Sequence, residues 1–150
     1  LYALTGNKRY LQAAMTLTDR VLELQDTGVD EPYYRGRFFN PQTPQYGSPH
    51  ASSDAVYVEG LAHAVEMAHA LGDMPRVERY SDALRLALLN LDNLQYRDAR
   101  LYFSRCVPCV EGAFRIHTTD NKVRVDSTQH ALDAFLKIDA LIVNNLLSLH

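Results

Sequence analysis

Apolar residues recur every three or four positions in several long stretches, which is the spacing of one face of an α-helix. The stretches are 8–25, 54–71, 75–95 and 126–146. Residues 1–5 are typical of a helix end, because Gly6-Asn7 follows and glycine readily takes the left-handed conformation there. Gly72-Asp73 ends the second long stretch in the same way. Short connections make helices antiparallel neighbours, so the pattern predicts an all-α chain of antiparallel helical hairpins.

The starts of three helices carry their own signals. Ser52, Ser53 or Asp54 can cap the helix that runs to residue 71, and Pro75 is suited to the first turn of the next helix. Asp126 and Gln129 have the spacing of a capping box, which predicts that the last helix begins at this point.

Two segments lack the helical period. Residues 26–53 hold four prolines and three glycines together with several aromatic side chains, and they predict a long, ordered aromatic loop that lies over the helices. Residues 97–125 alternate in short pieces around Cys106 and Cys109 and predict a small irregular β-hairpin.

An internal echo supports this division. Arg9-Tyr10 precedes Gln25 by the same spacing as Arg79-Tyr80 precedes Gln95, and the two sets lie 70 positions apart. This pattern predicts a repeated helical hairpin, a unit that buries its faces by stacking on further hairpins.

Composition narrows the class of protein. With 150 residues, 47% of them hydrophobic, the chain is expected to form one packed domain over 1–150. A formal net charge of -3 gives no basis for nucleic-acid binding. No apolar run approaches the roughly 20 residues that span a bilayer, and the first residues lack a signal-peptide pattern. We therefore expect no membrane partner; the compartment is unknown, with the cytoplasm slightly favoured.

Two motifs carry a resemblance to a known group of proteins. The first is Leu4-Thr5-Gly6-Asn7-Lys8-Arg9-Tyr10-Leu11, followed by an Ala/Leu-rich helix that ends in Leu24-Gln25, and the second is Tyr57-Val58-Glu59-Gly60-Leu61-Ala62 followed by Ala70-Leu71-Gly72-Asp73. Both are similar to the hairpin repeats of α/α-toroid proteins, and most of all to the six-hairpin glycosidase-like superfamily. That superfamily includes glycoside hydrolases, sugar epimerases and polysaccharide lyases.

The resemblance implies that this chain is part of a larger toroid, since a complete ring of that kind has more helices. It also implies that sites are built by the loops that precede the inner helices. In this sequence those are the loop before Asp54 and the hairpin before Ser127.

The densest polar group lies where the second irregular segment becomes the last helix: Arg115, Arg124, Asp126, Gln129 and His130. Arginines beside a helix start are suited to a uronate carboxylate or a phosphate, and Asp126 or His130 could transfer a proton. The alternative is structural: Asp126 and Gln129 cap the helix, Arg124 pairs with a carboxylate, and His130 is a satisfied first-turn histidine.

The aromatic loop and the helix after it supply the other candidates. Tyr34 and Arg37 combine aromatic faces with cations, which suits a sugar ring that carries an acidic group, although packing of the loop explains them as well. Asp54 and Glu59 lie at the entry to the helix and are candidate carboxylates for glycoside chemistry, with Tyr57 beside them. The expected catalytic residues are Asp126, His130 and Glu59.

The remaining motifs favour no metal and no cofactor. Glu59, His63, Glu66 and His69 have ligand-like spacing on one helix, yet no second helix carries a Glu-x-x-His to complete a di-metal site. Cys106 and Cys109 are spaced as a redox pair, half of a zinc site, or a structural staple of the loop.

Together these features favour a carbohydrate-related toroid protein that binds or processes an acidic saccharide, in the hydrolase, epimerase or lyase class. The alternative is a non-catalytic helical-repeat scaffold for protein–protein interaction. In either case the apolar last helix favours a homodimer.

Overall fold

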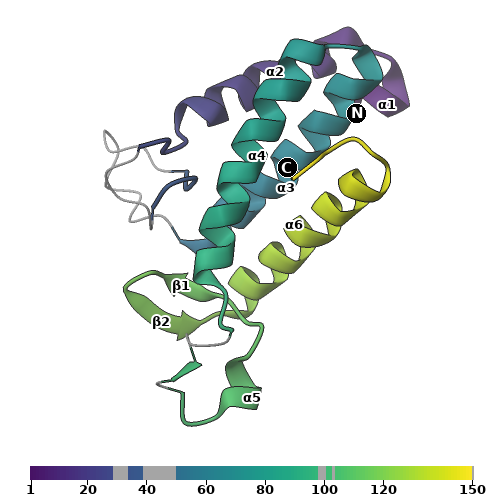
Figure 1. Cartoon of the computed structure of the whole chain (residues 1–150). Helices are drawn as coiled ribbons and strands as arrows, with labels where there is room; N and C mark the ends of the chain where they lie inside the picture. The colour runs from purple at the N-terminus through teal and green to yellow at the C-terminus, as the bar shows by residue number, and fades with distance from the viewer. Residues whose placement is uncertain (29–33, 39–49, 98–100, 103, 150) are drawn as a thin grey trace.

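A computed structural model describes residues 1–28, 34–38, 50–97, 101–102 and 104–149, and most of them lie in helices (Figure 1). The elements are α1 (Tyr2–Thr5), α2 (Lys8–Glu23), α3 (Ala51–Leu71), α4 (Met74–Leu94), α5 (Val107–Val110), β1 (Arg115–His117), β2 (Asp120–Val123) and α6 (Val125–Val143). The expectation of a mainly helical chain with a small β-hairpin is confirmed. Much of the long aromatic loop, residues 29–33 and 39–49, lies outside the described residues.

The predicted helix stops are confirmed. Gly6 and Gly72 end α1 and α3 in the left-handed conformation, with φ of 64° and 68°. Asp73 then caps α4 by accepting a hydrogen bond from the Arg76 amide, and Pro75 lies in the first turn, where a missing backbone N–H costs nothing.

One predicted helix start and one predicted capping box are wrong. Helix α3 begins at Ala51 and is capped by the side chain of His50, so Ser52, Ser53 and Asp54 all lie inside its first turn. Helix α6 begins at Val125, and its N-cap residue, Arg124, makes no side-chain capping bond. The capping box of Asp126 and Gln129 is therefore absent.

Asp126 is the second residue of α6 and not its N-cap, and its carboxylate accepts from the Ser127 amide at 3.0 Å and forms an ion pair. The Arg124 guanidinium donates to both carboxylate oxygens of Asp126 at 2.9 Å. This holds the carboxylate beside the first turn of α6, where a negative charge also complements the helix dipole.

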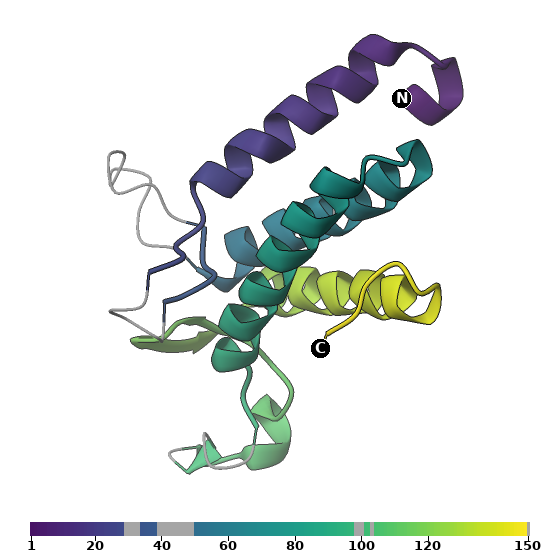
Figure 2. The same ribbon diagram turned by 45° about the horizontal axis from the view of Figure 1, so that its top comes forward.

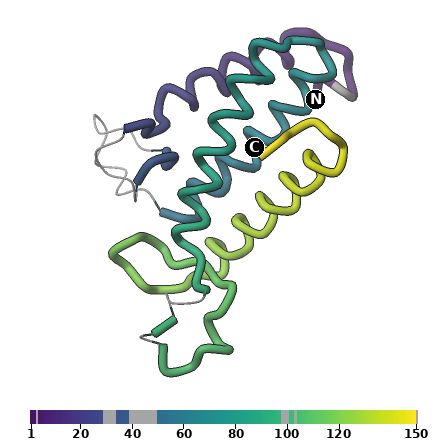
Figure 3. The backbone as a smooth tube through the Cα atoms, in the orientation of Figure 1, coloured from purple at the N-terminus to yellow at the C-terminus, as the bar shows by residue number. Residues whose placement is uncertain are grey.

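Helix α3 lies at the centre of the fold. It packs against α4 and α6 and also contacts α2. Figures 1 and 2 show that α3 and α6 run in the same direction while α4 runs the opposite way, and the backbone trace in Figure 3 follows the same course. The alanines of α3 allow its neighbours to approach closely. Among the largest buried side chains are Tyr80, Leu61, Leu84, Leu91 and Leu141.

The connection from α2 to α3 and the connection from α4 to α6 are built alike. After α2, Gln25 forms an isolated antiparallel bridge with Phe38, and after α4, Gln95 forms the same bridge with Phe114. The Gln25 side-chain amide donates to the Gly36 carbonyl oxygen, and the Gln95 amide donates to that of Gly112, in both cases at 3.2 Å.

The two connections also bind the helices that follow them, α3 and α6, in the same way. The Phe38 amide donates to the Asp54 side chain at 2.9 Å, and the Phe114 amide donates to the Thr128 side chain at 3.3 Å. Asp54 and Thr128 are both the fourth residue of their helix. Helix α2 with α3 and helix α4 with α6 are therefore two copies of one structural unit, as the sequence echo predicts.

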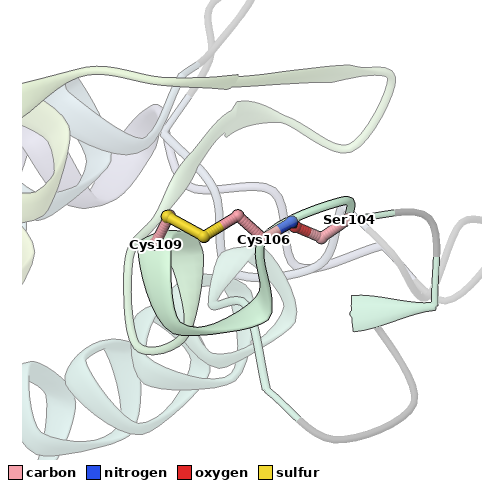
Figure 4. The surroundings of a disulfide bond; sticks show 3 residues. All are labelled: Ser104, Cys106 and Cys109. Atoms are coloured by element: carbon pink, nitrogen blue, oxygen red, sulfur yellow. A yellow bond between two sulfur atoms is a disulfide. The ribbon is translucent and has the colours of Figure 1, made fainter.

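The segment between α4 and α6 holds the remaining small elements. Strands β1 and β2 pair antiparallel, with Arg115 opposite Val123 and a register irregularity between Arg115 and His117. Cys106 and Cys109 form a disulfide at the start of α5, and the Cys106 amide donates to Ser104 Oγ at 3.2 Å (Figure 4). The pair is therefore disulfide-bonded, which is common to the structural staple and to the oxidised form of a redox pair.

The two connections differ in how tightly their glycines are enclosed, and this gives a matched pair of variants. A Cβ on Gly36 would lie 1.9 Å from the Leu86 carbonyl oxygen, whereas one on Gly112 would have no neighbour within 4 Å. Both residues have positive φ. We expect Gly112→Ala to lower the free energy of unfolding by about 1–2 kcal/mol from backbone strain alone.

Gly36→Ala adds a backbone clash, so its loss should be at least twice as large. Denaturant unfolding of both variants measures this. Equal losses would show that Gly36 does not lie in close contact with the Leu86 carbonyl oxygen of α4.

Candidate functional site

A cluster of side chains forms where segment 34–38 meets the β-hairpin. The Tyr34 and His117 rings are stacked with their centroids 5.9 Å apart. The Arg37 guanidinium carbon lies 4.1 Å from the centre of the Tyr34 ring. We call these three residues, with Asp54 and Asn90 beneath them, the loop cluster. It joins the loop before α3 to the hairpin before α6.

Asp54 and Asn90 form the floor of the loop cluster, and both side chains are buried. The Asp54 carboxyl accepts from the Phe38 amide at 2.9 Å and from the Asn90 side-chain amide at 2.8 Å. Burial raises the pKa of Asp54 to about 6, although these two hydrogen bonds and the charge of Arg37 act in the opposite direction. This carboxyl therefore changes its charge in the mildly acidic range.

The space inside the loop cluster is small. A cavity of about 10 Å³ lies between Asp54 and His117 and has room for a single water molecule at most. A ligand as large as a sugar ring must therefore contact the cluster from its outer side.

The electrostatic surroundings of His117 are positive. Burial lowers the pKa of His117, and the charges of Arg37, Arg115 and His50 lower it further, while Asp120 partly offsets them. Its Nδ1 accepts from the Thr119 amide at 3.3 Å, so in the neutral ring the proton is on Nε2. The imidazole is thus a neutral donor beside two arginines, of which Arg37 also donates to the Asp26 carboxylate at 3.2 Å.

Arg115 has a structural task within this region. Its guanidinium donates to the Asn93 carbonyl oxygen at 2.7 Å and to that of Thr118 at 3.4 Å. These bonds hold the hairpin against the end of α4. The expected ligand-binding arginine therefore positions His117 and adds its charge to the loop cluster.

A second polar group lies between α3 and α6. Glu59 accepts from His130 Nδ1 at 2.8 Å and from Lys137 Nζ at 3.2 Å. Burial alone would raise the pKa of Glu59, but the hydrogen bonds and charges of His130 and Lys137 outweigh it and hold the pKa below its ordinary value. Two of the three expected catalytic residues are thus brought together.

The residues of the polar group expected at the start of the last helix do not form one cluster. Arg124 and Asp126 form a surface ion pair, Gln129 is exposed, and His130 faces α3. Tyr57, expected to bind substrate, packs its ring 5.0 Å from that of Phe38.

The possible metal-binding face of α3 is also divided. His63 pairs with Glu66 at 3.2 Å, while His69 is within hydrogen-bond distance of the Leu146 carbonyl oxygen. Within the described part of the chain, no three His, Cys, Asp or Glu side chains are grouped as metal ligands would be.

Asn90 and His117 are the residues of the loop cluster that sequence reasoning missed. Asn90 falls three positions after Ala87 and four before Leu94, on the apolar face of its helix, and a polar residue there signals a buried hydrogen-bond partner. His117 carries no such signal, because its neighbour Tyr34 lies far away in the sequence.

Three kinds of comparison were made with known proteins. Family models, curated proteins and solved structures give no match to this chain. Among the helices in the described ranges, none combines the length and the apolar character needed to cross a bilayer.

The buried Asp54 predicts a pH dependence of stability with a definite sign. Because its pKa is raised in the folded chain, the stabilisation from the neutral carboxyl is complete below pH 3.8 and is lost as the pH rises through about 6. Asp54→Asn keeps an acceptor for the Phe38 amide and has no charge to bury. Relative to this variant, the wild type should lose about 3 kcal/mol of unfolding free energy across that range.

Chemical unfolding at a series of pH values measures this difference. Asp139→Asn, an exposed change on α6, is the control for removing one carboxylate. If the difference between wild type and Asp54→Asn does not vary with pH, Asp54 is not a buried, neutralised acid.

Proposed function

We propose that this chain is a carbohydrate-related protein of the α/α-toroid kind and that it binds an acidic saccharide at the loop cluster. One observation carries the proposal: segment 34–38 and the β-hairpin, which precede α3 and α6, meet through the stacked rings of Tyr34 and His117 among several cations. The sequence resemblance implies a site at the same place.

The arrangement of the helices supports the toroid part of the proposal. α3 and α6 lie side by side and run in the same direction, and each is preceded by an outer helix and the same bridged connection (Figure 1). Repetition of this unit would place the inner helices next to one another in a ring, with their preceding loops at one end.

The chemistry of the loop cluster supports the ligand class. The Tyr34 ring already contacts His117 and the Arg37 guanidinium, so the support for the ligand class comes from Arg37. Arginine is suited to a carboxylate because its donors match both oxygens. A neutral saccharide would make no use of the positive surroundings of His117. The carboxylate of a uronate would use them.

Glu59 and His130 support a reaction in the hydrolase, epimerase or lyase class. They are hydrogen-bonded to each other, and Glu59 lies five positions after Asp54, about 8 Å further along α3. A saccharide longer than one ring could reach from the loop cluster to this pair. Asp126, held by Arg124 on the surface, has no part in the proposed site.

The second candidate function, a scaffold for protein–protein contact, is favoured by the outer face of α6. Leu132, Leu136 and Val143 are exposed on this helix. Exposed apolar residues on one helix face are typical of a contact surface.

Binding of an acidic oligosaccharide tests the first proposal. We expect calorimetry to detect binding of an oligogalacturonate and to show much weaker binding of its methyl ester, which lacks the carboxylates. Arg37→Ala should weaken binding by about tenfold to a hundredfold, the effect of losing one charged hydrogen-bond partner.

Arg124→Ala is the matched control, because it also removes one positive charge but lies at the start of α6, paired with Asp126. Equal weakening by the two variants, or equal affinity for the acid and its ester, would contradict a specific site at Arg37. Thermal unfolding of Arg37→Ala checks that its fold is retained.

A further inference from the structure

The structural repeat sets a register between the two inner helices. The first residues of α3 and α6 are 74 positions apart, and so are Asp54 and Thr128, the two side chains that accept from the equivalent Phe amides. Each residue of α3 therefore has an equivalent in α6. Comparing the exposed fractions of equivalent residues shows which face of each helix has no neighbouring helix.

The face of α6 that corresponds to the covered face of α3 is open. In α3, Val58 is 0% exposed and Ala62 is 2% exposed. Their equivalents in α6, Leu132 and Leu136, are 55% and 59% exposed. Asp133, equivalent to Glu59, lies between them on this surface, which we call the α6 face.

On the opposite edge of the fold, residues of α6 are covered by α3 while their equivalents in α3 are exposed. Helix α6 presents His130 and Lys137 to α3, since both contact Glu59, and Ala134 lies between them with 0% exposure. The equivalents in α3, which we call the α3 edge, are Val56, Gly60 and His63.

The α3 edge has no covering helix within the described chain. Val56 is 45% exposed, the His63 side chain is 65% exposed, and a Cβ built on Gly60 would meet no atom within 4 Å. A glycine at the centre of such an edge permits a close approach of another helix.

The two open surfaces carry equivalents of an ion pair that joins α3 to α6. Inside the chain, the Glu59 carboxylate of α3 binds Lys137 of α6. If the same packing is repeated one step further, Asp133 takes the place of Glu59 and His63 of the next unit takes the place of Lys137. Asp133 then meets the His63–Glu66 pair, in which His63 is the basic partner, while Leu132 and Leu136 lie over Val56 and Gly60.

We propose that the α6 face of one copy of this chain binds the α3 edge of a second copy, in the way that α3 binds α6 within the chain. The contact is head-to-tail, because two different surfaces meet, and each copy keeps one surface open for a further copy. A two-fold contact between α6 faces, the simplest form of the homodimer expected from the sequence, would bring the Asp133 side chains of both copies to one surface and leave Val56 exposed.

Two substitutions block one surface each. Leu136→Glu places a charge on the α6 face, and Gly60→Arg fills the α3 edge with a large side chain. Both positions are exposed, so the fold should be retained, and thermal unfolding checks this. Val123→Glu, at an exposed apolar position on β2, is the control for adding a charge elsewhere.

Sedimentation of the chain between about 1 µM and 1 mM provides the test. The wild type and Val123→Glu should show a mass that rises with concentration above the 17.0 kDa of one chain. Each blocking variant should remain near 17.0 kDa alone. An equimolar mixture of the two should form a dimer, because one variant keeps its α3 edge and the other keeps its α6 face.

Three results would overturn the proposal. The first is a wild type that stays at the mass of one chain at every concentration. The second is self-association of Gly60→Arg alone with none for Leu136→Glu, which would show a two-fold contact through α6. The third is that each variant alone stays at the mass of one chain and that their mixture does so as well, which would place the contact elsewhere.

Discussion

The buried carboxyl of Asp54 ties together three segments that are far apart in the sequence. It accepts from the backbone of Phe38 and from the side chain of Asn90, so the aromatic segment, α3 and α4 meet at one group. A buried carboxyl without these partners would be costly, and with them it holds segment 34–38 against α3 and α4. That path directs Tyr34 and Arg37 toward the hairpin, and the loop cluster depends on it.

The second connection reaches the same geometry with a different group. Thr128 accepts from Phe114 where Asp54 accepts from Phe38. A hydroxyl completes the backbone hydrogen bond without a charge, so the fold of the connection does not require a carboxyl. The acid at position 54 therefore adds something that the connection alone does not need: a titratable group beneath a cluster of cations.

The same repeat explains why α3 and α6 differ in exposure. α3 has a neighbour on each side and buries small side chains, whereas α6 carries larger apolar side chains on a face that stays open. Exposure of Leu132 and Leu136 follows from their place at the end of the repeat, since the equivalent positions in α3 are covered by other helices of this chain. Both the ligand proposal and the contact proposal thus rest on one repeated unit.

Local chemistry in the sequence determined the helices, their glycine stops at Gly6 and Gly72, and the repeat marked by Gln25 and Gln95, because these depend on neighbouring residues and on backbone conformation. Sequence reasoning also named Tyr34, Arg37 and Asp54 as candidate ligand-binding residues. The partners of these residues were decided only by tertiary structure. Asn90 reaches Asp54, and His117 stacks on Tyr34, through contacts between distant segments that no local pattern records. The expected cap at Asp126 is absent because the helix begins one residue before it, at Val125, and the Asp126 carboxylate accepts from Arg124 and from the Ser127 amide instead.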